Sequence, residues 1–186
     1  MTFIELFIIA IGVSMDAFAV SICKGLSVKK LQPKHMLSTG MWFGGFQALM
    51  PLIGFYVGIH FSDLVTSVDH WIAFALLAII GFGMVKESRD QDCDDIDPDF
   101  SFKTMLTMAV ATSIDALAIG VSFAFLKVDI WMSVLLIGIT TGLLSILGVN
   151  IGNIFGTRYK STAELMGGII LIVMGVKILV EHTLLQ

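Results

Sequence analysis

The chain has 186 residues, of which 56% are hydrophobic and 14% charged, with a formal net charge of −4. Its mean hydropathy is +0.93. Ordinary soluble domains carry roughly 25% charged residues, so this composition excludes a soluble domain and indicates a multi-pass protein of the lipid bilayer. The sequence has no GxxxxGK[ST] phosphate loop and no room for a nucleotide-binding domain, so any transport is passive or driven by an ion gradient. We expect no enzyme activity, no cofactor and no nucleic-acid partner.

Six apolar segments are long enough to cross a bilayer core of about 30 Å as helices that rise about 1.5 Å per residue. They lie near residues 3–24, 37–59, 69–86, 102–126, 130–154 and 164–182. The predicted fold class is therefore an all-α membrane protein with six transmembrane helices.

The first segment carries an aspartate, Asp16, inside its apolar run. Residues 17–19 imitate the small-x-small site of signal peptides, but no basic residues precede the run and Asp16 interrupts it. We therefore expect residues 3–24 to be a retained helix. An ionised carboxylate at the centre of a membrane helix costs about 2.5 to 3.5 kcal/mol on insertion scales, so an aspartate at this position indicates a function.

An acidic segment, residues 89–101, separates the third and fourth predicted helices. Its acids superficially match a calcium-binding EF-hand loop, but Asp95 stands where that loop needs glycine and Ser101 where it needs glutamate. We interpret the segment as a solvated cytoplasmic linker, and an alternative is that it concentrates cations at the cytoplasmic entrance. The two cysteines, Cys23 and Cys93, imply no disulfide framework.

Two halves of the sequence repeat each other. The SMDAFA motif around Asp16 recurs 99 positions later as SIDALA around Asp115, and Gln47 is matched 98 positions later by Ser145. Four glycine pairs are also matched at an offset of 98 positions: Gly40 and Gly138, Gly44 and Gly142, Gly54 and Gly152, and Gly58 and Gly156. Two later pairs are matched at an offset of 94 positions: Gly81 and Gly175, and Glu87 and Glu181. This pattern indicates a duplicated three-helix unit.

The duplication predicts the architecture. The units are residues 1–88 and residues 102–186, joined by the linker of residues 89–101 into one membrane domain. Because three is odd, the second unit enters the membrane from the opposite side, which gives inverted repeats with the substrate at the midplane between them. Small residues flank each aspartate at i−4 and i+3, so we expect the two aspartate helices to cross tightly with both carboxylates at the contact.

A shared metal site follows from the paired aspartates. Two adjacent carboxylates repel each other unless a cation lies between them, and a divalent cation meets that need. Further oxygen ligands come from hydroxyls or freed carbonyls, from amides and from water. The candidates are Ser14, Thr112, Ser113, Gln47 and Asn150. Neither aspartate helix contains proline, so a break at Ser14 or Ser113 is not signalled, although local unwinding stays an open alternative.

The missing nitrogen and sulfur ligands restrict the ion. The four histidines all fall near predicted helix ends, at His35, His60, His70 and His182. Oxygen ligands alone favour Mn²⁺, Mg²⁺ or Ca²⁺, whereas Zn²⁺ and Cu⁺ prefer imidazole or thiolate.

Positive charges predict the orientation. Nine of the eleven Lys and Arg residues fall in the connections after the first, third and fifth helices. Such residues accumulate on the cytoplasmic side, so both termini should be extracytoplasmic. Lys177 lies about one turn before the end of the last helix, where it can extend outward and meet Glu181 at i+4.

The SMDAFAVS and TSIDALAIG segments, the FGGFQALMPLIG run and six short-looped helices resemble the MntP-type manganese efflux pumps of bacteria, within the lysine exporter superfamily. The resemblance spans the whole chain. It implies export of Mn²⁺ across the bacterial inner membrane, with Asp16 and Asp115 essential. Gln47 occupies a polar position of the second helix that can be acidic in similar proteins.

Three other functions compete with Mn²⁺ export. An exporter of another divalent cation or of a cationic amino acid is the nearest, although no basic residue at the midplane would receive an amino-acid carboxylate. An intramembrane aspartyl protease also uses two aspartates on helices, but its YD and GxGD motifs are absent here. A channel is the third, and the inverted repeat favours alternating access over it. Carboxylates that exchange metal for protons would make the proton a natural counter-ion.

Overall fold

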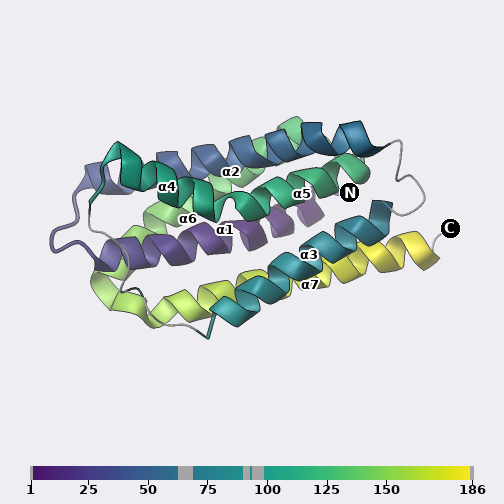
Figure 1. Ribbon diagram of the computed structural model, residues 1–186. Coiled ribbons are helices and arrows are strands. Elements are labelled where there is room, and N and C mark those ends of the chain that lie inside the picture. Colours follow the sequence, from purple (N-terminus) through teal and green to yellow (C-terminus); the bar gives the residue numbers. More distant parts are fainter. Residues whose placement is uncertain (1, 63–68, 90–92, 94–98, 185–186) are drawn as a thin grey trace.

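The computed structural model describes residues 2–62, 69–89, 93 and 99–184, and the regular structure within them is helical. The helices are α1 (Phe3–Leu26), α2 (Pro33–Ser62), α3 (Asp69–Glu87), α4 (Phe102–Thr112), α5 (Ile114–Phe125), α6 (Ile130–Phe155), the short 3-10 helix η1 (Gly156–Tyr159) and α7 (Lys160–Leu184). Figure 1 shows an elongated bundle in which α3 and α7 pair beside the other helices, and α1 begins at the end where α7 terminates. The predicted all-α class is confirmed.

Each predicted membrane segment corresponds to helical structure, with two differences. The segment near residues 102–126 forms two helices, α4 and α5, bent by 42° at a break between them. Two helices also begin earlier than their apolar cores. α7 begins at Lys160, and α2 begins at Pro33, where a proline fits because the first helical N–H has no intrahelical partner.

Four of the described helices are long and apolar enough to cross a membrane, and the bent pair of α4 and α5 raises that number to five. The four are α1, α2, α6 and α7. Over its described residues α3 does not meet the same test, although it is a helix of 19 residues. The chain is therefore a multi-pass membrane protein, while the sixth span and the division into two units stay predictions.

Side-chain caps define where three of the helices begin. At α1, Thr2 and Glu5 form a capping box, in which the Glu5 N–H donates to Thr2 Oγ1 (3.4 Å) and the Thr2 N–H donates to Glu5 Oε2 (2.8 Å). Asp129 caps α6 by accepting from the Trp131 N–H at 3.0 Å, and Ser101 caps α4.

Close packing occurs mainly between the two predicted units. α1 packs on α6 and α7, α2 packs on α5 and α6, and α3 packs on α7 and α5. Glycines permit these approaches. A Cβ atom at Gly54 would lie 2.0 Å from the carbonyl oxygen of Leu117, and one at Gly152 would lie 1.9 Å from that of Ile22. Gly54 and Gly152, which recur between the halves, are thus packing residues.

The predicted tight crossing of the two aspartate helices is wrong. Gly12 of α1 packs instead on α7, where an added Cβ would lie 2.9 Å from Ile170 Cγ2. Gly120 of α5 packs on α2, where an added Cβ would lie 2.1 Å from the carbonyl oxygen of Pro51. Neither aspartate helix is the main partner of the other, because the small residues of each serve contacts with different helices.

Contacts at the end of α1 attach the linker to the bundle and correct a second expectation. Cys23 and Cys93, 70 residues apart, form a disulfide, which sparse cysteine usage did not suggest. The buried Lys24 donates to the carbonyl oxygen of Asp99 at 2.7 Å, and its ammonium lies 4.6 Å from the ring centroid of Phe100. Hydrogen bonds from Ser101 keep the pKa of Asp99 below its usual value. The other acids of the linker lie outside the described residues.

Candidate metal-transport site

Asp16 is half-buried in the middle of α1, between the buried residues Met15 and Ala17. Its carboxylate lies within electrostatic range of three other acids, Asp115, Glu87 and Glu164. Asp115 in turn interacts with Glu87. Asp115 is thus among the acids near Asp16, although the two residues are 99 positions apart in the sequence.

Asp115 stands in the first turn of α5, directly after a break in the helix. Ser113 at the break has φ −105° and ψ 0°. The hydroxyls of Thr112 and Ser113 donate back to the carbonyls of Met108 (3.0 Å) and Ala109 (2.5 Å). Such back-bonding bends helices, and two consecutive cases explain a break without proline. Asp115 therefore sits at the positive N-terminal end of a half-helix, which favours a bound or fixed negative charge.

Gln47 of α2 is fully buried and reaches this break. Its side-chain amide donates to the carbonyl oxygen of Thr112 at 3.0 Å. The amide oxygen of Gln47 has no hydrogen-bond partner among the described residues. In addition, Pro51 has no N–H to offer the backbone carbonyl of Gln47 four residues earlier. α2 thus presents two oxygens without a regular partner near the start of α5.

Two further predicted ligands have other surroundings. The hydroxyl of Ser14, fully buried in α1, donates to the carbonyl of Ala10 at 2.6 Å and pairs with Thr141 Oγ1 of α6 at 2.7 Å. α1 stays continuous there, because a single back-bonding serine does not interrupt it. Asn150 is half-buried on α6, and no described contact joins it to either aspartate. One turn later, Asn153 donates to the carbonyl of Gly25 at 3.1 Å.

Sequence reasoning missed Glu87 and Glu164 as neighbours of the site. Glu87 is exposed at the end of α3. Glu164 is 4% exposed near the start of α7, with its Oε1 atom 3.9 Å from the ammonium of Lys160. Both lie at the ends of apolar segments, where an acid usually faces solvent. The repeat could have pointed to Glu87, because Glu87 is matched by Glu181 in the second unit.

Few side chains of the usual metal-binding types lie close together in the part of the chain that the structure describes. Within the described ranges, no three His, Cys, Asp or Glu side chains lie close enough together to hold one metal ion. A cation bound at the two aspartates would therefore complete its shell with neutral oxygens or water. This arrangement suits hard ions, which accept carbonyl, hydroxyl and water ligands.

The membrane-length helices define the chain as a multi-pass α-helical membrane protein, and it carries acidic residues inside the bundle. Its residues 30–179 match a family model described as "Mntp: Putative manganese efflux pump". The chain belongs to this family, the MntP family. It is therefore a member of a transporter family rather than of a family of enzymes.

Bacterial relatives carry the same description over nearly their whole length. A "Putative manganese efflux pump MntP" from Desulfitobacterium hafniense is 59% identical over 179 residues, covering 96% of this chain and 95% of its own. The protein so named from Acetivibrio thermocellus is 59% identical over 183 residues, with 98% and 92% covered. The one from Mannheimia succiniciproducens is 56% identical over 186 residues, with 99% of both chains covered. No solved structure matches the chain.

Proposed function

We propose that this protein exports Mn²⁺ from the cytoplasm by binding the ion between Asp16 and Asp115 near the membrane midplane. The proposal is carried by one observation, that Asp16 and Asp115 stand at matched positions of the repeat and that Asp115 is among the acids near Asp16. Two carboxylates in a poorly hydrated site repel each other, and a divalent cation between them removes that repulsion. The description of the family names the metal.

Neutral oxygens complete the proposed site. The amide oxygen of Gln47 and the backbone and hydroxyl oxygens of Thr112 and Ser113 surround the break at which Asp115 begins its helix. Ser14 and Asn150 stay predicted ligands. Because every candidate donates oxygen, another divalent cation is the closest competing substrate. A cationic amino acid is the next, since its ammonium would also pair with the aspartates.

We also propose that residues 1–88 and 102–186 are inverted repeats. A two-fold relation requires helix contacts to occur in matched pairs, and they do: α1 on α6 is matched by α5 on α2, and α1 on α7 by α5 on α3. Where α2 meets α6, a Cβ at Gly44 would lie 2.7 Å from the oxygen of Gly138, and one at Gly40 would lie 3.0 Å from that of Gly142. Exchanging the units turns each glycine pair into the other, as a pseudo-two-fold axis requires.

Alternating access gives these repeats a mechanism. The units differ at equivalent positions, since α1 is continuous at Ser14 whereas its counterpart is broken at Ser113. Exchange of these two conformations would open the site to opposite sides of the membrane in turn. Protons compete with the metal for the same carboxylate oxygens, so metal entry releases protons and low pH weakens metal binding. Proton antiport follows from this exchange.

Transport into inverted membrane vesicles tests the function. Vesicles that contain the protein are expected to accumulate Mn²⁺, and an acidic interior is expected to accelerate the uptake, because protons leaving the vesicle would drive metal inward. Vesicles without the protein serve as the control, and excess lysine should not compete. Absence of Mn²⁺ uptake would overturn the function. Uptake that ignores the pH gradient would leave Mn²⁺ export standing but replace antiport with a uniporter or channel.

The proposed orientation places both termini outside the cytoplasm, in the bacterial inner membrane. α1 begins at the end of the bundle where α7 terminates (Figure 1), and nine of the eleven Lys and Arg residues fall in the connections predicted to face the cytoplasm. A reporter fused after Gln186 should therefore behave as extracytoplasmic. After reduction with a permeant reagent, Cys93 should react with a membrane-impermeant thiol label only in permeabilised cells. Efficient labelling in intact cells would reverse the orientation and the direction of transport.

A further inference from the structure

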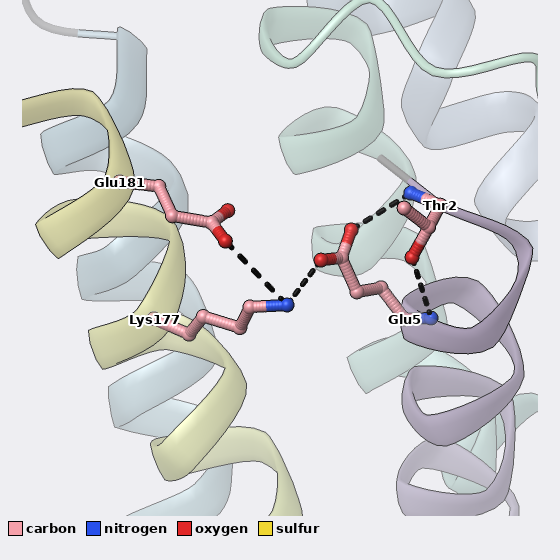
Figure 2. Close-up of polar contacts among 4 residues, drawn as sticks. All are labelled: Thr2, Glu5, Lys177 and Glu181. Atoms are coloured by element: carbon pink, nitrogen blue, oxygen red, sulfur yellow. Dashed lines mark hydrogen bonds and ion pairs between the residues drawn. The ribbon is translucent and has the colours of Figure 1, made fainter. Parts of the chain in front are cut away.

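An ion-pair network joins α1 and α7 at the end of the bundle that holds the start of α1. The Lys177 ammonium pairs with Glu5 Oε1 on α1 and lies 3.5 Å from Glu181 Oε1 on its own helix. The second oxygen of Glu5 accepts from the Thr2 N–H at 2.8 Å, so the capping box holds the carboxylate in place. Figure 2 shows Lys177 between the two glutamates. The contact with Glu181 is the one predicted, and the contact with Glu5 is new.

We propose that Glu5 and Lys177 are positioning residues for transport, whose ion pair keeps the extracytoplasmic end of the protein closed and breaks when the substrate leaves. This inference rests on the proposed function for its direction. It concerns the path out of the protein rather than the metal site, and it assigns a role to two charged residues that the site does not use.

The pair closes a layer of apolar side chains between the site and the extracytoplasmic end. On α1, Leu6, Ile9 and Val13 are at most 5% exposed between Glu5 and the aspartate. On α7, the buried residues Leu171 and Met174 occupy the corresponding stretch, and the buried Ile178 directly follows Lys177. Apolar side chains offer an ion no ligands, so a path between α1 and α7 requires the two helices to separate. Glu5 and Lys177 are the charged link between these helices at its outer edge.

The opposite end of the site is built differently. There the neighbours of Asp16 include Glu87, which is exposed, and the buried Glu164. Acids that lead from an exposed position toward the aspartates suit the entry of a cation, whereas the apolar layer excludes it. The structure thus corresponds to a state closed at the Glu5 end.

The ion pair of Glu5 and Lys177 has no counterpart at the matched positions of the repeat. At the matched offsets, the counterpart of Glu5 is Thr104 and the counterpart of Lys177 is Gly83. A Cβ at Gly83 would meet nothing within 4 Å. Neither matched position carries a charge, so no ion pair can form between Gly83 of α3 and Thr104 of α4. An ion pair that has no counterpart at the matched positions biases the resting state toward closure at the end where it forms.

The location of the pair also allows it to break. The side chain of Lys177 is 41% exposed, and that of Glu5 is 12% exposed. A partly exposed ion pair is weak enough to open during a transport cycle. When it opens, Glu181 remains beside the ammonium of Lys177 on the same helix, so the lysine keeps a partner in the open state.

Cross-linking tests the need for separation. In a Cys23→Ser, Cys93→Ser background, Glu5→Cys with Lys177→Cys is joined by a reducible bis-methanethiosulfonate reagent. Mn²⁺ uptake by inverted vesicles is expected to fall to background when the link is complete and to return on reduction. The matched control is Lys177→Cys with Glu181→Cys, which links residues of one helix, and its uptake before and after linking should be the same. Full uptake by the linked α1–α7 protein would overturn the proposal.

Accessibility gives a readout that does not depend on the substrate. Ile9→Cys in the same background places a thiol one turn below Glu5, and Lys177→Met is expected to raise its labelling from the extracytoplasmic side about fivefold, the population shift that a partly exposed ion pair can cause. Glu181→Gln, which leaves the Glu5 pair intact, should not. Unchanged labelling in Lys177→Met would overturn the gate. Increased labelling in a protein that moves no Mn²⁺ would retain the gate and reject the proposed substrate.

Discussion

Replacement of either Asp16 or Asp115 by asparagine is expected to abolish resistance to Mn²⁺ in cells that depend on this protein. Each change removes one of two carboxylates that interact inside the bundle. Loss of a residue in the outer shell of a metal site already lowers metal affinity about 10- to 100-fold, and loss of a direct ligand should cost more. Because both aspartates would hold the same ion, the double variant should be no worse than either single variant. Growth in graded Mn²⁺ measures the effect.

Conservative and remote changes are the controls for this result. Asp16→Glu and Asp115→Glu should also fail substantially, since an added methylene displaces the oxygens within a fixed cavity. Glu181→Gln removes the same charge from an exposed position outside the proposed metal site and should retain resistance well above that of the aspartate variants. Full protection by Asp16→Asn or by Asp115→Asn, at normal protein levels, would refute a shared site.

Hydropathy was sufficient to place the helices, because lipid permits few alternatives to a helix with satisfied backbone groups. The predicted segments near residues 3–24 and 130–154 correspond closely to α1 and α6. The break at Ser113 could not be predicted from apolar length. It depends on two adjacent hydroxyls that donate to backbone carbonyls of the preceding turn, and on the Gln47 side-chain amide that donates to the Thr112 carbonyl. These are contacts between segments far apart in the sequence.

The sequence marks the candidate site only as far as the repeat does. Duplication singled out Asp16 and Asp115, whose role as metal ligands stays a prediction, and Asp115 is among the acids near Asp16. It did not single out Glu164, because a single acid at the edge of an apolar segment resembles an ordinary helix end. The ion pair of Glu5 with Lys177 could not be predicted from the sequence either, because it depends on α1 packing against α7. Small residues around Asp16 predicted close packing but could not say on which helix.

Substitution of alanine for Gly54 or Gly152 is expected to destabilise the folded protein, even though alanine favours helices by about 1 kcal/mol over glycine. The new methyl group would lie 2.0 Å from the oxygen of Leu117 or 1.9 Å from that of Ile22. Non-bonded heavy atoms prefer about 3.5 Å, so α2 and α5, or α6 and α1, would have to move apart by on the order of 1 Å. Overpacking of this kind costs about 1 to 3 kcal/mol, and the contact is with backbone, which cannot rotate away.

Gly45→Ala and Gly83→Ala are matched controls, because a Cβ at either position meets nothing within 4 Å. These variants gain helix propensity without a clash, so their melting temperature in detergent should equal or exceed that of the parent protein. Gly54→Ala and Gly152→Ala should melt several degrees lower and should lose Mn²⁺ uptake in proportion to folded protein. The effect also bears on the repeat, since Gly54 and Gly152 are matched positions and should respond alike. If all four variants melted together, the helices would not be in the close backbone contact on which the geometry of both aspartates depends.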